Sequence, residues 1–428
     1  MKPFILFATV LETALAVSAG AEVSVERFEA LVADTAPRAV EWRHHLHQNP
    51  ELSNRETETA AYVARHLEAM GLEIETGIAR TGVLGVLRGD QPGPTVAVRA
   101  DIDALPVTEA SGLPFASTRR TEYEGREVGV AHACGHDVHT AVALGLAEVL
   151  AGARAELPGT VLFVFQPAEE GVPAGERGGA RLMMEEGIFA GRQPTAIYAL
   201  HSWPSRDVGQ VEAAPGPTWA AVDRFRVVLH GRQAHGAYPD QGIDPVVMAA
   251  QAVTGLQTIR SRNLDPRAAS VVTVGMIHGG ERFNIIPGEV RLEGTVRTYR
   301  PDVQDRIEVR MEEILAGVAA AAGGRHELEY ERITPATVND EALHRAARAT
   351  LEATLGAANV FPAEPTMAGE DFAYFTAAVP GYYFRLGVRA LGGESGTLHT
   401  PTFRADDGAV EVGMRALGRV ILDALQAP

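Results

Sequence analysis

Residues Ala131 to His139 read Ala-His-Ala-Cys-Gly-His-Asp-Val-His and lead into the apolar run Ala141–Leu150. Five side chains that can bind a metal lie in this stretch, among them Cys134, the only cysteine of the chain. The pattern predicts a ligand-bearing loop that enters a buried helix, with Asp137 capping the helix. A lone cysteine is more often a small buried hydrophobe. A closed zinc site rich in cysteine is excluded because there is no second cysteine, so further ligands must be distant histidines or carboxylates.

Three other apolar runs have the length of buried strands, namely Thr95–Ala100, Val161–Phe165 and Ala196–Leu200. Helical segments Ala141–Leu150 and Gly178–Glu186 separate them. This alternation predicts a parallel sheet with helical crossovers, in which sites gather beyond the carboxyl ends of the strands. Each run is followed by side chains that can bind a metal or move a proton: Asp101, Asp103, Glu169, Glu170 and His201.

The remaining pattern predicts how the 428 residues divide into domains. Residues 218–334 show the order β-α-β-β-α-β of a small two-layer domain, and apolar segments of the first kind resume after it. We therefore expect an α/β protein in which residues 22–217 and 335–428 form one domain, with a mostly parallel sheet flanked by helices, and 218–334 are inserted into it. In the first domain, Ser53–Glu56 reads as a capping box for a helix that ends near Met70.

Composition narrows the classes of function. The formal charge of -17 argues against a nucleic-acid partner. Met1–Ala21 combines Lys2, an apolar run and a small-x-small ending at Ala19 and Ala21, which is typical of a cleaved export signal. We therefore expect a periplasmic or secreted protein; the alternative is an amphipathic or disordered extension of a cytoplasmic one. No other stretch is long and apolar enough to span a membrane.

The acids and histidines at the strand ends fit metal-dependent hydrolysis. Glu169 and Glu170 are adjacent, so in an extended strand end one can bind a metal while the other faces a reacting water. Asp101 or Asp103 can orient a ligand histidine. Five side chains would suffice for two ions a few ångströms apart, with Cys134 as a bridging thiolate: Cys134, His136, Glu170, His201 and His399. Glu169 would then act as the base in amide hydrolysis. A covalent acyl-enzyme on Cys134 is the competing chemistry.

Four motifs in this order resemble the co-catalytic metallopeptidase superfamily of aminoacylases and carboxypeptidases. The most similar branch contains hippurate hydrolases, N-acyl-amino-acid amidohydrolases and indole-acetyl-amino-acid hydrolases. The resemblance extends from about Glu41 to Phe403, and the motifs are Asn49-Pro-Glu-Leu-Ser53, Arg99-Ala-Asp-Ile-Asp-Ala-Leu-Pro106, His132-Ala-Cys-Gly-His-Asp137 and Gln166-Pro-Ala-Glu-Glu-Gly171.

The resemblance implies the same five ligands, with Glu169 as catalytic base and Asp103 in support. It also implies that the inserted domain is a lid and a dimer surface. His235 matches a histidine that stabilises the tetrahedral intermediate, often across the dimer, while Asn284 and Arg297 match residues that hold the substrate carboxylate.

The sequence thus predicts a metal-dependent amidohydrolase that cleaves the amide bond of N-acyl amino acids or related small conjugates. Two divalent ions are expected, zinc or manganese ahead of cobalt or nickel, in a homodimer or higher homo-oligomer. An exopeptidase or dipeptidase of the same superfamily is one alternative. A catalytically silent metal- or ligand-binding protein is the other.

Overall fold

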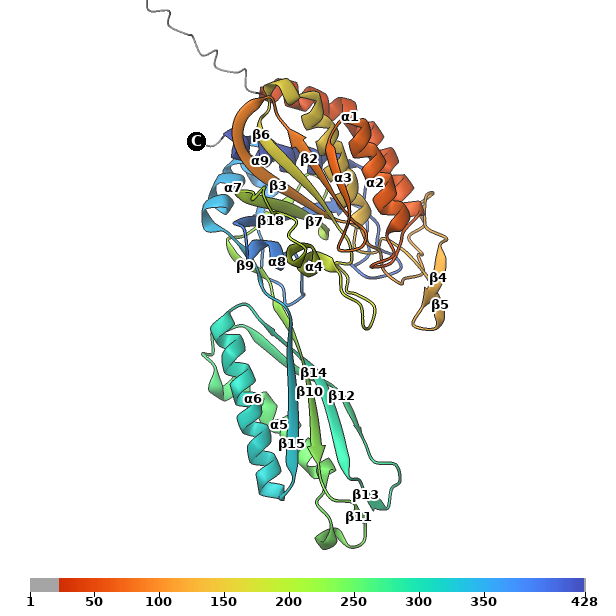
Figure 1. Ribbon diagram of the computed structural model, residues 1–428, viewed down its shortest axis with the longest axis vertical. Coiled ribbons are helices and arrows are strands. Elements are labelled where there is room, and N and C mark those ends of the chain that lie inside the picture. Colours follow the sequence, from red (N-terminus) through yellow and green to blue (C-terminus); the bar gives the residue numbers. More distant parts are fainter. Residues whose placement is uncertain (1–22, 427–428) are drawn as a thin grey trace, which may run out of the picture.

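The structure, a computed structural model, describes residues 23–426 and consists of two α/β parts joined end to end (Figure 1). The larger part is built on an eight-stranded sheet in which the central strands β6, β3, β7 and β18 are parallel. The predicted parallel sheet is confirmed. In spatial order the strands are β1 (Glu73–Ile78), β2 (Gly82–Arg88), β6 (Pro158–Gln166), β3 (Gln91–Asp101), β7 (Ala196–Asp207), β18 (Gly381–Arg389), β8 (Val211–Ala213) and β17 (Val360–Pro362).

Helices cover both faces of this sheet. The main apolar core lies under α1 (Val25–Gln48), α2 (Thr57–Ala69), α3 (His136–Gly152), α7 (Glu341–Leu355) and α9 (Gly408–Gln426). The opposite face carries a smaller core under α4 (Gly179–Glu185) and α8 (Ala373–Thr376). None of the described helices is long and apolar enough to cross a bilayer.

Helix α3 is buried over most of its length because it lies between α1, α9 and the sheet. This explains why the run that follows the ligand loop has no polar face. The close approach of α9 depends on Gly145, since an added Cβ there would overlap the sulfur of Met414 and lie 3.2 Å from the Cβ of Ala39. The start of α3, which carries the predicted ligands, is therefore held rigidly against the sheet.

The smaller part is an antiparallel four-stranded sheet with two helices on one face (Figure 1). Its elements follow the expected order β-α-β-β-α-β. They are β10 (Ala221–His230), α5 (Pro245–Thr258), β12 (Ser270–Gly279), β14 (Glu289–Thr298), α6 (Pro301–Ala322) and β15 (Arg325–Thr334). A short pair, β11 (Ala234–His235) with β13 (Ile285–Ile286), lies at the end far from the larger part (Figure 1).

The two crossings between the parts run side by side. Strand β9 (Gly216–Trp219) pairs antiparallel with β16 (Thr337–Asn339). The inserted segment therefore leaves and re-enters the larger part at one place. A hairpin that the sequence did not predict, β4 (Arg120–Tyr123) with β5 (Arg126–Gly129), projects from the larger part on the side of the inserted domain (Figure 1).

The predicted capping box at Ser53–Glu56 is wrong. Helix α2 begins at Thr57, and the carboxylate of Glu51 accepts the first backbone N–H groups, from Glu58 and Thr59. Ser53 instead donates to Asp103 at 2.7 Å, and the buried Glu56 accepts from the backbone N–H of Ala168. Tertiary contacts thus occupy both side chains that would have formed the box.

The predicted N-cap at Asp137 is also wrong. The cap of α3 is Gly135, whose φ of 90° is the left-handed conformation that favours glycine. Asp137 lies in the first turn, where it accepts from Arg43 at 3.0 Å and contacts His47 Nδ1 at 2.9 Å. Its carboxylate fastens α3 to α1 rather than capping the helix.

Candidate metal centre

The predicted ligands meet beyond the carboxyl ends of the central strands. Strand β6 ends at Gln166, shortly before Glu169 and Glu170, while β7 carries His201. The loop before α3 supplies Cys134, and α3 itself begins at His136. His399 comes from a loop near the C-terminus and is anchored by its backbone N–H, which donates to the carbonyl of Ala133 at 2.8 Å.

Two overlapping groups of ligand atoms share Cys134. Cys134, His136 and His201 form one group, and Cys134, Glu170 and His399 form the other, with the ligand atoms in each group within 4.8 Å of one another. Cys134 Sγ lies 3.4 Å from His201 Nε2, and His399 Nε2 lies 3.3 Å from Glu170 Oε1. Soft sulfur, imidazole nitrogen and carboxylate oxygen together suit divalent transition metals. The arrangement fits two ions with Cys134 between them.

Two atoms at the centre have no hydrogen-bond partner although they are buried, namely His136 Nε2 and Glu170 Oε1. Buried polar atoms are almost always paired, so unpaired ones need an explanation. They lie 3.8 Å apart. Metal ions accept lone pairs from both imidazole nitrogen and carboxylate oxygen, so ions in the two groups of ligands would satisfy both atoms.

The other ring nitrogen of two ligand histidines is held by the protein. His136 Nδ1 lies 2.9 Å from the carbonyl oxygen of Asp103, and His201 Nδ1 lies 2.8 Å from that of Ser202. A carbonyl can only accept, so each Nδ1 carries a proton and Nε2 is the nitrogen that is left to bind a metal. His399 is held differently, at a φ of 62° that is uncommon for a residue other than glycine and typical of functional sites.

The electrostatics of the centre favour positive charge. Burial opposes the imidazolium of His136, but Asp101, Asp103 and Glu170 outweigh it and raise the pKa to about 10. Burial, together with Glu170 and Glu169, raises the pKa of the Cys134 thiol well above its usual range. A thiolate at Cys134 therefore requires a cation beside it. Burial and the neighbouring His139 lower the pKa of His201, which keeps this imidazole in the neutral form that binds metals.

Glu169 lies beside the candidate ligands, with its carboxylate within 4.8 Å of the ligand atoms of His136 and Glu170. Its carboxylate lies 4.0 Å from His136 Nε2. On another side, it lies within 4.8 Å of the carboxylates of Glu370 and Asp371. Burial and the charges of Glu370 and Glu170 raise the pKa of Glu169 well above its usual range. A carboxylate with a raised pKa beside a cation site can accept and release a proton during a reaction.

A buried network that the sequence did not predict lies beside this carboxylate. Arg99 on β3 contacts Asp101 at 2.7 Å, Glu370 at 2.9 Å and Asp371 at 3.3 Å. Asp101 in turn contacts His139 Nδ1 at 2.6 Å. The signal in the sequence was an arginine inside an otherwise apolar strand, which is rarely buried without partners.

The structure does not bring all predicted residues to the centre. Arg297 on β14 reaches the larger part, where its Nη1 would lie 3.6 Å from a Cβ at Gly369. His235 on β11 and Asn284, which precedes β13, lie at the far end of the inserted domain (Figure 1). Within one chain, these two residues do not contact the candidate ligands.

Comparison with known proteins shows to which family the chain belongs. The model of the peptidase family M20/M25/M40 matches residues 97–423. An N-acetyl-L-cysteine deacetylase of Bacillus subtilis is 40% identical over 369 residues, which cover 86% of this chain and 83% of that protein. An N-acetyldiaminopimelate deacetylase of Listeria innocua is 38% identical over 352 residues, which cover 81% of this chain and 89% of that protein.

A solved structure is similar over nearly the whole chain. It is the YXEP protein of Bacillus subtilis, described as a dinuclear metal binding peptidase from the M20 family. The TM-score is 0.79 at 34% identity, with 92% of this chain and 100% of that chain covered. The arrangement of strands and helices around the candidate metal centre is therefore shared with a protein that binds two metals.

Proposed function

We infer that this chain, which belongs to peptidase family M20/M25/M40, is a metal-dependent amidohydrolase that cleaves the amide bond of N-acyl amino acids or related small conjugates. The observation that carries the inference is the pair of ligand groups that share Cys134, with the carboxylate of Glu169 at their edge. The similar deacetylases release an acetyl group from an amino acid, which is chemistry that such a centre can perform.

Each predicted ligand has a proposed role. Cys134, His136, Glu170, His201 and His399 would hold two divalent ions, with the Cys134 thiolate belonging to both groups of ligands. We propose zinc or manganese, with cobalt and nickel as alternatives, because thiolate, imidazole and carboxylate together accept all four. When bound, the ions lower the pKa of a water molecule and polarise the amide carbonyl.

Glu169 moves the proton in this proposal. It takes a proton from the attacking water and delivers it to the leaving amine, and its buried position beside Glu370 favours the protonated form between the two steps. Asp103 has a supporting role, because its contact with His136 Nδ1 fixes the tautomer of this ligand.

The inserted domain supplies contacts to the substrate. We propose that residues 22–217 and 335–428 form the catalytic domain and 218–334 a lid and dimerisation domain. Arg297 makes no ion pair with any described carboxylate, so its guanidinium can receive the substrate carboxylate as a forked pair.

A homodimer would explain the remote position of His235 and Asn284. These residues can reach a metal centre only in another subunit, where His235 would donate to the developing oxyanion and Asn284 would help to hold the carboxylate. Strand β12 lies at the edge of its sheet and exposes Met276 and Ile277. An exposed apolar edge strand is typical of a surface that pairs with another chain.

Export is a separate proposal. The segment Met1–Ala21 lies outside the described residues, so the proposal rests on its sequence alone. We propose that it directs the protein to the periplasm or the medium. N-terminal sequencing of the mature protein tests this, and an intact Met1 would contradict it.

The proposed activity is tested with purified protein reconstituted with zinc or manganese, assayed on hippurate, a panel of N-acetyl amino acids and unblocked dipeptides. Hydrolysis of the first two classes supports an amidohydrolase, whereas cleavage of the dipeptides alone indicates an exopeptidase. Glu169→Gln should retain both metals and lose on the order of a thousandfold in kcat. Metal binding without hydrolysis of any substrate would indicate a silent binding protein.

A further inference from the structure

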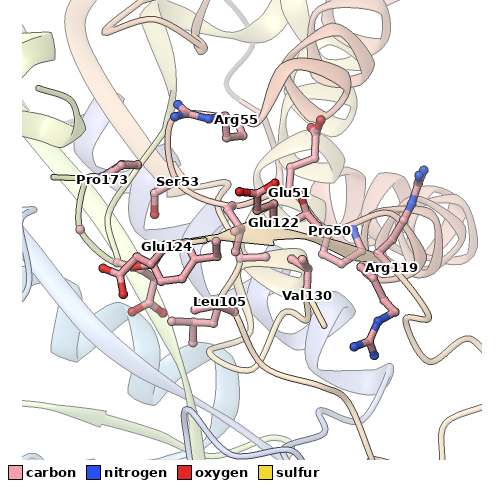
Figure 2. A pocket seen from close by; sticks show the side chains of 18 of the residues that line it. Pro50, Glu51, Ser53, Arg55, Leu105, Arg119, Glu122, Glu124, Val130 and Pro173 are labelled. Atoms are coloured by element: carbon pink, nitrogen blue, oxygen red, sulfur yellow. The ribbon is translucent and has the colours of Figure 1, made fainter. Parts of the chain in front are cut away.

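A cavity of about 600 Å³ opens beside the candidate metal centre (Figure 2). The candidate ligand Glu170 is one of its lining residues, and its walls are the β4–β5 hairpin, residues 49–58 and residues 170–174. We refer to it as the hairpin cavity. Pockets of this size hold drug-sized ligands, so an acetyl group would leave most of it empty.

Apolar side chains form one part of the lining of the hairpin cavity, which we call its floor. Leu52 and Ala104 are joined by a β-bridge and pack with Val130 and Tyr123 in a small separate cluster. Leu105 follows them and forms a bridge with Ala131. Because backbone bridges hold these residues, the floor is preformed.

Two of the three arginines in the wall form ion pairs with glutamates that do not line the cavity. Arg55 pairs with Glu176, Arg120 pairs with Glu127 at 2.8 Å, and Arg119 donates to the side-chain oxygen of Asn49 at 2.8 Å. Among the lining arginines, Arg119 alone has no carboxylate partner, and its contact with the neutral Asn49 leaves its charge in place. Among the described residues, three exposed lining glutamates have no ion-pair partner: Glu58, Glu122 and Glu124. The hairpin presents two of them at the cavity (Figure 2).

Glu169 and Glu170 both lie near His136, and each also belongs to a second group of side chains. Glu169 lies with Glu370 and Asp371, on the side where Arg297 meets Gly369. Glu170 lies with His399 and lines the hairpin cavity. A substrate whose carboxylate is held at Arg297 would therefore extend its acyl group toward Glu170.

We propose that the hairpin cavity is the acyl pocket of this enzyme and selects uncharged, apolar acyl groups of about six or more carbon atoms over acetyl. This proposal rests on the proposed amidohydrolase function and specifies its substrate class. The apolar floor stabilises the acyl chain by removing it from water, and the unpaired glutamates repel an acyl group that ends in a carboxylate.

Three substrates with the same amino acid test the proposal on the metal-loaded wild-type protein: N-acetyl-, N-hexanoyl- and N-adipoyl-methionine. Hexanoyl and adipoyl chains have equal length, but adipoyl ends in a carboxylate. We expect kcat/KM for the hexanoyl substrate to exceed that for the acetyl and adipoyl substrates by at least about tenfold each.

The hairpin can be removed in a defined way. The backbone N–H of Val130 already donates to the carbonyl of Arg119 at 3.0 Å, so deletion of residues 121–128 leaves Arg120 and Gly129 as a two-residue turn. This variant should lower the hexanoyl-to-acetyl ratio of kcat/KM to below about three, because one wall is gone. Tyr123→Ala is the smaller change and should lower the ratio at least about threefold. Arg126→Ala lies on the same hairpin but outside the cavity, and should keep the wild-type ratio.

The outcomes separate the two proposals. If wild-type protein hydrolyses the acetyl substrate as well as the hexanoyl one, or if both hairpin variants keep the wild-type ratio, the acyl pocket is wrong while the amidohydrolase function stands. If none of the three substrates, hippurate or the other N-acetyl amino acids is hydrolysed faster than by Glu169→Gln, the function itself is wrong. If the circular dichroism signal shows that the deletion variant does not fold, the acyl pocket is judged from two results: the kcat/KM ratios of the wild-type protein and the change in the hexanoyl-to-acetyl ratio in Tyr123→Ala.

Discussion

His136 presents its Nδ1 to Asp103, at 2.9 Å from the carbonyl oxygen and 3.2 Å from the carboxylate oxygen Oδ1. The same carboxylate accepts from Ser53 and from the backbone N–H of Glu170 through Oδ2. Asp103 therefore orients one candidate ligand through its ring and another through its backbone. Its effect on the metal centre should be larger than that of a residue that contacts one ligand alone.

Asp103→Asn should weaken metal binding by about 10- to 100-fold and leave the fold intact, because an amide at this position removes the charge that holds the protonated Nδ1. Competition with a chelator measures the affinity, and circular dichroism measures the fold. The exposed Asp90→Asn is the matched control. Unchanged metal affinity in Asp103→Asn would show that the backbone carbonyl is sufficient.

Cys134→Ala should lose bound metal and hydrolysis together, because both ligand groups depend on the thiolate. The fold should survive, since a small buried side chain is replaced by another small one. Elemental analysis gives the metal content and thermal unfolding gives the stability. A variant that still holds two equivalents of metal would exclude a bridging thiolate.

His47 should make stability depend on pH. Burial opposes its charge, but Asp137 and Glu109 outweigh burial and raise the pKa to about 9 from an ordinary value near 6.5. A raised pKa means that this stabilisation is fully present below pH 6.5 and is lost as pH rises through 9. The free energy of unfolding should fall by on the order of 3 kcal/mol across this window.

The matched comparison for this effect is His47→Gln, which keeps two polar contacts but cannot titrate. Denaturant unfolding at pH 6, 7.5 and 9.5 gives the free energies. The difference in stability between wild type and variant should shrink as pH rises. A constant difference across these pH values would show that His47 is not charged in the folded protein.

Arg99→Met should destabilise the larger part by about 3–5 kcal/mol, because it leaves Asp101, Glu370 and Asp371 buried without their cation. Arg38→Met removes an exposed ion pair with Glu148 and should cost less than about 1 kcal/mol. Denaturant unfolding compares the two variants. Similar values for both would mean that the buried carboxylates take up protons when Arg99 is absent.

Much of the fold follows from patterns that act over short distances along the chain. The runs Thr95–Ala100, Val161–Phe165 and Ala196–Leu200 are apolar because both faces of their sheet are covered, and this marks them as parallel strands. The candidate ligands follow them at the same edge. Periodicity likewise placed every main element of the inserted domain.

The errors concern contacts between distant residues. Nothing near Asp137 indicates that Arg43, 94 residues earlier, occupies its carboxylate. The hydroxyl of Ser53 likewise donates to Asp103, which lies in another loop. The β4–β5 hairpin was missed because Arg120–Gly129 is polar and exposed, so burial leaves no alternating pattern in it.

Strand β18 lies between β7 and β8 in the large sheet, although residues 214–380 separate it from β8 along the chain. During synthesis, the edge of β7 that pairs with β18 therefore stays unpaired until β18 has been made. The four-stranded sheet of the inserted domain has all its strands by Thr334, before β18 is made. We expect the inserted domain to acquire its structure first on the ribosome, so that the last part of the chain to emerge completes the sheet that carries the metal centre.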